Sequence, residues 1–127
     1  SKFLDSLTPE LAEQETANEI KLSIDSIVAE AIPEYFEELK FSKPEMLLAM
    51  ERMVPRIPLD AARWEGEMHE IANTFSDAGI TPKFHQASAD IMKLADKTPI
   101  AKETRETVDQ NRSLIEALDM YVEALKK

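Results

Sequence analysis

The chain has 127 residues, a formal net charge of −10, no cysteine and only two glycines. The lack of cysteine excludes disulfides and thiolate metal sites, and the acidic surface repels phosphate backbones and anionic membranes at long range. The sequence shows no signal peptide, and no apolar run approaches the roughly 18 residues of a transmembrane helix. We therefore expect a cytoplasmic protein with no nucleic-acid or membrane partner. Ser1 is not an initiator methionine, so we expect a piece of a longer protein.

The first predicted helix begins after Thr8-Pro9, with threonine as the N-cap and proline as the first helical residue. Apolar residues then recur at three- and four-residue steps as far as Ala31, which predicts an amphipathic helix of about six turns. Pro33 is expected to end or kink this helix, because proline lacks the N–H and clashes with the preceding turn. A short helical segment over residues 34–39 is expected to follow.

The next two helices are predicted from their caps and their apolar faces. Ser42 and Glu45 fit a capping box, and Asp60 is expected to cap the helix that follows the break between Pro55 and Pro58. The apolar side of the first of these helices consists of Met46, Leu47, Met50, Met53 and Val54. That of the second consists of Ala61, Trp64, Met68, Ile71, Ala72 and Phe75.

Two further helices complete the prediction. Gly79 occupies the place of a left-handed C′ residue, and Thr81-Pro82 starts the next helix at once. The buried side of that helix is expected at Phe84, Ala87, Ile91, Met92 and Ala95. After a turn at residues 97–99, the last helix is expected over residues 103–125. Its apolar stripe is Leu114, Ile115, Leu118, Tyr121, Val122 and Leu125.

No segment alternates with a period of two for long enough to form a strand. The sequence therefore predicts one all-α domain of five or six packed helices over residues 1–127. The six methionines are interpreted as flexible core residues, with an adaptable partner groove as the alternative.

The histidines were tested for metal and substrate chemistry. A zinc protease motif needs a second histidine four residues after His69, and that place holds Asn73, so no metal site is predicted. His69 is instead expected on the surface, in a local pair with Glu65. His85 begins a helix beside Phe84, and it is either an edge-of-core imidazole or a substrate contact at the mouth of a cleft. The clustered carboxylates are interpreted as solvated helix faces.

No G-x-G-x-x-G turn or phosphate loop occurs in the chain. Dinucleotides generally need such a glycine turn at a helix N-terminus, because the backbone must approach the pyrophosphate. The sequence therefore predicts that this chain alone binds no cofactor.

One stretch has a more specific pattern. Residues 63–82 read R-W-x-G-E-M-x-E-I-A-x-T-F-x-D-A-G-I-x-P. This pattern resembles the helical C-terminal domain of phosphogluconate dehydrogenase-like and beta-hydroxyacid dehydrogenase-like proteins, most strongly over residues 55–96. The resemblance implies the 6-phosphogluconate dehydrogenase C-terminal domain-like fold. It also implies a homodimer, a small-molecule hydroxyacid substrate, and a Rossmann domain in cis or trans that holds NAD or NADP for the parent enzyme.

The same resemblance suggests site residues on the first predicted helix. The family carries a lysine that acts as general acid-base, followed four residues later by an asparagine that holds substrate. Lys21 and Asp25 occupy these places here, so the resemblance implies that Lys21 transfers the proton and that Asp25 takes the substrate-binding place of the asparagine. His85 is the other candidate substrate contact, on the chemistry of its imidazole and not on the resemblance. The chain departs from the family in lacking glycines before Lys21 and in carrying aspartate for asparagine. The plain alternative is a surface Lys–Asp pair.

These observations lead to one main expectation and one alternative. The chain is expected to be the substrate-binding and dimerisation domain of an NAD(P)-dependent hydroxyacid or phosphogluconate dehydrogenase-like oxidoreductase, inactive alone. The alternative is a stand-alone helical module without catalysis that binds a protein partner or a small ligand.

Overall fold

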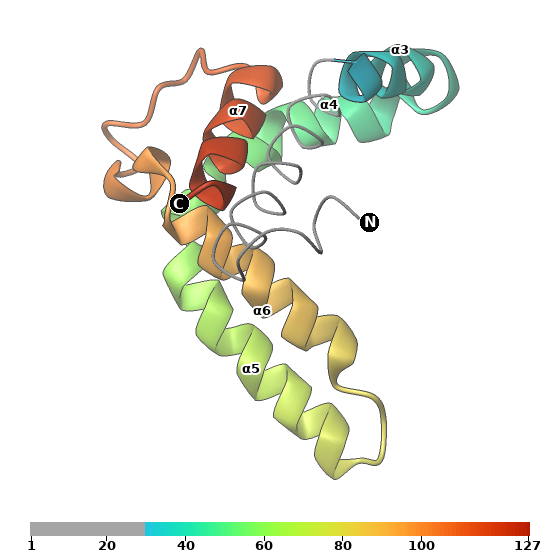
Figure 1. Cartoon of the computed structure of the whole chain (residues 1–127), viewed down its shortest axis with the longest axis vertical. Coiled ribbons are helices and arrows are strands. Elements are labelled where there is room, and N and C mark those ends of the chain that lie inside the picture. The colour runs from blue at the N-terminus through green and yellow to red at the C-terminus, as the bar shows by residue number, and fades with distance from the viewer. Residues whose placement is uncertain (1–29) are drawn as a thin grey trace, which may run out of the picture. The chain divides into compact units, whose positions relative to one another are not determined.

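The computed structural model describes residues 30–127, and these residues contain α-helices and 3-10 helices but no strand, which confirms the all-α prediction. The α-helices are α3 (Ile32–Ser42), α4 (Pro44–Met53), α5 (Ala61–Asp77), α6 (Lys83–Asp96) and α7 (Leu114–Leu125) (Figure 1). The 3-10 helices are η2 (Val54–Leu59) and η3 (Pro99–Lys102). The contacts within the chain divide it into two units, residues 1–44 and 45–127. The first predicted helix, with Lys21 and Asp25, lies outside the described residues.

Helix α3 is longer than the predicted segment at residues 34–39. Pro33 lies in its first turn, where the missing N–H of proline costs nothing and its fixed φ suits the helix. Glu34 in the first turn and Lys40 in the last turn both have the charge that the helix dipole favours. The helix ends where Lys43 N–H donates to the Leu39 carbonyl at 2.8 Å.

The predicted capping box at Ser42 and Glu45 is wrong. Helix α4 begins at Pro44, so the position before its first residue is held by Lys43, and Ser42 is the last residue of α3. The Ser42 hydroxyl donates to the Glu38 carbonyl at 2.9 Å instead. Pro44 accounts for the start of α4 at this residue, because proline has a helical φ and no N–H that would need a partner.

The segment η2 lies at the centre of the C-terminal unit. It packs against α5, α6, α7 and η3, and both of its prolines, Pro55 and Pro58, are buried. From α7, the Tyr121 hydroxyl donates to the Val54 carbonyl at 3.1 Å. Burial of that phenol raises the pKa of Tyr121 to about 12. The break that was predicted between the prolines is therefore an ordered turn to which the neighbouring helices attach.

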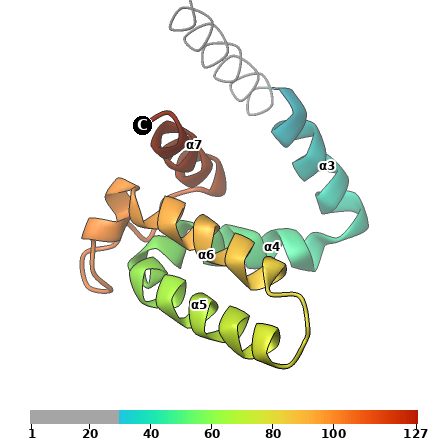
Figure 2. The same cartoon turned by 60° about the horizontal axis from the view of Figure 1, so that its bottom comes forward.

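Helices α5 and α6 form an antiparallel hairpin, and they lie side by side in both views (Figures 1 and 2). The fully buried residues of the pair are alanines: Ala61 and Ala72 on α5, and Ala89 and Ala95 on α6. Small side chains at the contact allow the two helix axes to approach closely.

The buried side predicted for α6 is wrong in part. Phe84 and Ile91 are 73% and 54% exposed, and Ala87 is exposed too, whereas Ala95 is buried as expected. Helix α6 has two neighbouring apolar stripes, and the one that contains Ala89 is buried. A two-helix hairpin covers only one stripe of each helix, so the stripe of Phe84, Ala87 and Ile91 remains on the surface.

A small buried cluster lies where the chain turns back at η3. Its members are Thr98, Ile100 and Pro58, which are the largest fully buried side chains of the described residues. The Thr98 hydroxyl donates to the Ala95 carbonyl at 2.8 Å, which satisfies a polar group that would otherwise be costly to bury. The predicted turn at residues 97–99 is thus present and forms part of the core.

The last helix is shorter than predicted, because α7 begins at Leu114 and residues 103–113 are not helical. Ser113 is the N-cap residue of α7, and its hydroxyl accepts from Glu116 N–H at 3.1 Å. The Glu116 carboxylate accepts in turn from Ser113 N–H at 3.2 Å, which completes a capping box.

The end of α5 confirms the prediction for Gly79. Its φ is +77°, in the left-handed region that side chains with a Cβ disfavour. Ile80 N–H donates to the Phe75 carbonyl at 2.8 Å and Gly79 N–H to the Ser76 carbonyl at 3.0 Å, the two bonds of a Schellman motif.

The two glycines give opposite predictions for the same substitution. Gly79→Ala should lower the free energy of unfolding by about 1 kcal/mol, because alanine resists positive φ although its Cβ would meet no atom. Gly66→Ala should raise it by about 0.5–1 kcal/mol, because Gly66 lies inside α5 where a Cβ also meets open space. Urea unfolding followed by circular dichroism measures both, and a stabilised Gly79→Ala would contradict the assignment.

Candidate functional site

The structure locates one of the three predicted site residues. His85 lies between two rings, with its ring centroid 4.8 Å from that of Phe75 and 5.2 Å from that of Phe84, both edge-on. Its Nδ1 is buried without a hydrogen-bond partner. Lys21 and Asp25 lie outside the described residues, so the structure does not bring the three together, and their roles stay predictions.

His69 lies on the outer surface of α5. Its Nε2 is 3.9 Å from a carboxylate oxygen of Glu65, and its side chain is 55% exposed, which confirms the predicted local pair. Within residues 30–127, no three histidine, aspartate or glutamate side chains lie together in a way that could hold a metal ion. None of the helices in this part is long and apolar enough to cross a bilayer.

A cluster of arginines surrounds Asp60, between η2 and α5. Asp60 Oδ2 accepts from Arg105 Nη2 at 2.8 Å, and Oδ1 accepts from Arg63 Nη2 at 3.5 Å. The Asp60 side chain is 21% exposed, so the surrounding protein shields this carboxylate partly from water. The strong contact with Arg105 joins residues far apart in sequence and fixes the loop after η3 beside the start of α5.

Asp60 is the N-cap residue of α5, as predicted, but its side chain does not make the capping bond, since no N–H of α5 bonds to its carboxylate. Its backbone, with φ −114° and ψ 2°, is not in the extended conformation from which capping side chains usually reach the N2 or N3 N–H. The carboxylate bonds to guanidinium groups instead, and charge-assisted bonds of this kind are the stronger ones.

Beside Asp60, a surface pocket of about 260 Å³ lies between the last turn of α4, η2 and the first turn of α5. Its lining consists of Arg52, Met53, Arg56, Ile57, Asp60 and Trp64. Two arginines therefore share this pocket with Met53, Ile57 and Trp64. We call this hollow the arginine pocket.

A smaller hollow of about 110 Å³ adjoins the arginine pocket, since Arg56 and Asp60 line both. Arg105, Val108 and Gln110 come to it from the loop at residues 103–113. Arg56 donates to the side-chain oxygen of Gln110. Arg56 is thus held by a neutral amide, while Arg105 is held by the carboxylate of Asp60.

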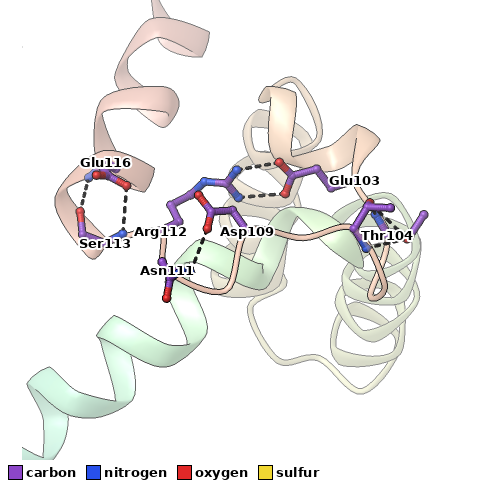
Figure 3. A network of polar contacts seen from close by, with 8 residues as sticks. Glu103, Thr104, Asp109, Asn111, Arg112, Ser113 and Glu116 are labelled. Carbon is purple, nitrogen blue, oxygen red and sulfur yellow. Dashed lines mark hydrogen bonds and ion pairs between the residues drawn. The ribbon is translucent and has the colours of Figure 1, made fainter.

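The loop that carries Arg105 and Gln110 is held by a two-bond ion pair (Figure 3). The Arg112 guanidinium donates to both oxygens of Glu103, at 2.9 and 2.6 Å, and the Arg112 side chain is only 7% exposed. These bonds from Arg112 hold the pKa of Glu103 below its ordinary value, and they raise the pKa of Arg112.

Short local bonds order the rest of this loop (Figure 3). Thr104 N–H donates to the Thr107 hydroxyl at 2.8 Å, and Asn111 N–H donates to Asp109 Oδ1 at 2.9 Å. Threonine and aspartate commonly make such turns, because their short side chains reach backbone groups two or three residues away. The loop therefore has a defined shape without being helical.

A third pocket, of about 370 Å³, lies where η3 meets α7. Pro99, Met120 and Ala124 supply its apolar surface, and its charged residues are Lys97, Glu116, Asp119, Glu123 and Lys127. Its carboxylates already have structural bonds in two cases, because Glu116 caps α7 and Glu123 pairs with Lys126 at 3.2 Å. The arginine pocket is the better candidate site, since its charges are less compensated.

The arginine pocket was not predicted from the sequence. The only local indication is the spacing of Arg52 and Arg56, four residues apart beside Trp64 in an acidic chain. Their joint position depends on the 3-10 turn at η2, and Arg105 reaches Asp60 across 45 residues. That tertiary contact has no sequence pattern of its own.

Fold and site together define a helical domain with a basic pocket at one turn. Residues 28–95 match the model of the family described as Domain of unknown function (DUF1932). The match covers more than half of the 127 residues, and the chain belongs to this family of 6-phosphogluconate dehydrogenase C-terminal-like helical domains. No curated protein and no solved structure matches the chain.

The Glu103–Arg112 pair should stabilise the domain measurably. Arg112→Ala should lower the free energy of unfolding by about 2 kcal/mol, because it leaves a partly buried carboxylate without its two charge-assisted bonds. Arg63→Ala is the matched control, since it removes an exposed arginine from α5, and it should change little. Equal effects of the two variants would contradict the structural role of the pair.

The same pair should give a pH dependence. The folded state holds the pKa of Glu103 below its ordinary value of 4.5, so the stabilisation is present above that pH and is lost as pH falls below it. The difference in unfolding free energy between the unsubstituted chain and Glu103→Gln should therefore shrink from pH 6 towards acid. A constant difference would contradict this origin.

Proposed function

We propose that this domain is the C-terminal substrate-binding and dimerisation part of an NAD(P)-dependent hydroxyacid or phosphogluconate dehydrogenase-like oxidoreductase, inactive alone. The observation that carries the proposal is the family match over residues 28–95. The pattern of residues 63–82 lies inside the matched range and spans the α5–α6 turn with its left-handed Gly79.

The placement of the glycines supports a cofactor held by another part of the enzyme. Gly66 lies in the middle of α5, and Gly79 follows the C-terminal end of that helix. Neither forms a glycine turn that leads from a strand into a helix, which is how the backbone usually approaches a pyrophosphate. The described residues do not fit a dinucleotide, so we assign NAD or NADP to a Rossmann domain in cis or trans.

In this proposal, Lys21 removes the hydroxyl proton of the hydroxyacid as the carbon gives up hydride. Asp25 lies four residues further along the chain, and His85 is the third proposed substrate contact. A neutral lysine amine can accept a proton, and an imidazole can donate or accept a hydrogen bond near neutral pH.

The complete coding sequence provides the test of this function. We expect it to encode a G-x-G-x-x-G turn upstream of Ser1, and its product to oxidise a hydroxyacid with NAD or NADP. Lys21→Ala should lower kcat at least about a hundredfold with little change in KM, because general acid-base catalysis typically contributes that much. Lys83→Ala, which removes an exposed lysine from α6, is the control.

One outcome counts against the dehydrogenase proposal, and another counts only against the role of Lys21. A product that lacks a nucleotide-binding half would favour the alternative, a helical module that binds a partner or a small ligand without catalysis. Full activity of Lys21→Ala would leave the domain assignment but remove Lys21 from the chemistry.

The dimerisation role is supported by the uncovered stripe on α6. Phe84 is 73% exposed and Ile91 is 54% exposed, with Ala87 between them, whereas the outer side of α5 carries Glu70, Asn73 and Thr74. Exposed apolar side chains gathered on one helix face are typical of an interface. We place a second copy of the chain on this stripe.

Substitution on the stripe should separate the copies. Phe84→Glu combined with Ile91→Glu should convert a dimer into a monomer, because each copy would then bury unpaired carboxylates at the contact. Thr74→Glu, on the outer side of α5, should leave the dimer intact. Light scattering after size-exclusion chromatography measures the mass, and a monomeric unsubstituted chain at high concentration would contradict the dimer.

A further inference from the structure

We infer that the arginine pocket binds a small organic anion: a carboxylate or phosphate group, gripped by Arg52 and Arg56, joined to an apolar body that lies on Trp64. The proposal rests on the geometry of this pocket, and it stands whether or not the chain is part of a dehydrogenase.

The charge balance of the pocket favours an anionic ligand. The chain has 25 acidic and 15 basic side chains, so an arginine without a carboxylate partner is unexpected. In the described part of the chain, Arg52 makes no hydrogen bond or ion pair, and Arg56 bonds to the neutral Gln110 amide. Two arginines thus line one pocket, and neither forms an ion pair with a carboxylate of the described residues.

The one carboxylate in the pocket, that of Asp60, already has cationic partners. Asp60 Oδ2 accepts from Arg105 at 2.8 Å, and Oδ1 accepts from Arg63 at 3.5 Å. Because both oxygens face cations outside the arginine pocket, Asp60 opposes an entering anion less than an unpaired carboxylate would. The positive charge of Arg52 and Arg56 therefore remains available to a ligand.

The side chains of the pocket also indicate the chemistry of the ligand. Guanidinium groups bind carboxylate and phosphate oxygens through parallel hydrogen bonds, which lysine cannot reproduce. Met53, Ile57 and Trp64 give the pocket an apolar surface that favours a hydrocarbon or aromatic body next to the anionic group.

Size and charge together restrict the ligand to a small molecule. The pocket volume of about 260 Å³ lies just below the usual range of roughly 300–1,000 Å³ for small-molecule sites. A nucleic acid would meet the long-range repulsion of a chain with net charge −10, whereas a single carboxylate or phosphate meets mainly the local arginines.

The indole in the pocket provides a direct measurement, because Trp64 is the only tryptophan of the chain. Phenyl phosphate and phenylacetate should each change its fluorescence in a saturable way. Inorganic phosphate should bind more weakly because it lacks the apolar body, and neutral benzyl alcohol should bind more weakly because it lacks the charge. The tighter of the two aromatic anions identifies the preferred group.

Matched variants separate the pocket from general electrostatics. Arg52→Gln combined with Arg56→Gln should weaken phenyl phosphate at least tenfold, while Lys83→Gln with Lys93→Gln, which removes the same charge from exposed positions on α6, should leave it unchanged. Arg52→Lys with Arg56→Lys keeps the charge but removes the parallel hydrogen bonds of the guanidinium groups, and it should give an intermediate affinity. Calorimetry provides a readout independent of the indole.

Three results would overturn the proposal. They are an unsubstituted chain that shows no saturable binding of either aromatic anion, equal weakening by the arginine and lysine pairs, and unchanged binding after the arginine substitutions. If the double arginine variant fails to fold by circular dichroism, the single variants Arg52→Gln and Arg56→Gln decide, each with an expected weakening of at least threefold.

Discussion

Two prolines fix the backbone on which the C-terminal unit is assembled. Pro55 and Pro58 hold η2 in a short 3-10 turn, and this turn contacts α5, α6, α7 and η3. Proline restricts φ before folding, so the turn loses less conformational entropy than a flexible connection would. The hydrogen bond from Tyr121 to the Val54 carbonyl then attaches α7 to the same turn. Since η2 also carries Arg56, the segment that organises the core positions the candidate site as well.

Polar contacts define the position of the loop at residues 103–113, which the small apolar core does not specify. The buried side chains of the α5–α6 hairpin are alanines, which allow close packing but specify little by shape. Beyond the hairpin, the loop at residues 103–113 is held by the pair of Arg112 with Glu103 (Figure 3). A second contact, from Arg105 to Asp60, holds the same loop. Charge-assisted bonds are strong and directional, so they define where the loop lies. The arginine pocket is therefore built on the proline turn, and the ion-paired loop lines the smaller hollow beside it.

The sequence predicted the parts of this fold that depend on local chemistry. The helix class, the left-handed Gly79 and the turn at residues 97–99 follow from dihedral preferences and helical periodicity, and each is present. Some predictions were wrong because a second local signal was stronger, and others because the outcome depends on tertiary contacts. Pro44 displaced the cap expected at Ser42, and the capping box at Ser113 shortened the last helix, although its Ser-x-x-Glu pattern is visible in the sequence. The buried stripe of α6 and the partners of Asp60 depend on contacts between distant residues, which periodicity does not contain.

The contact between Arg105 and Asp60 has a consequence for the order of folding. It closes 45 residues of chain, whereas the α5–α6 hairpin is joined by a short turn at Gly79. Contacts between residues close in sequence cost little loop entropy and form early. Contacts between residues far apart in sequence form later, because closing the longer loop costs more entropy. The helices of the hairpin should thus form before Arg105 contacts Asp60. During biosynthesis, Asp60 would gain its bond to Arg105 only after residue 105 has emerged and docked, so the smaller hollow beside the arginine pocket forms late.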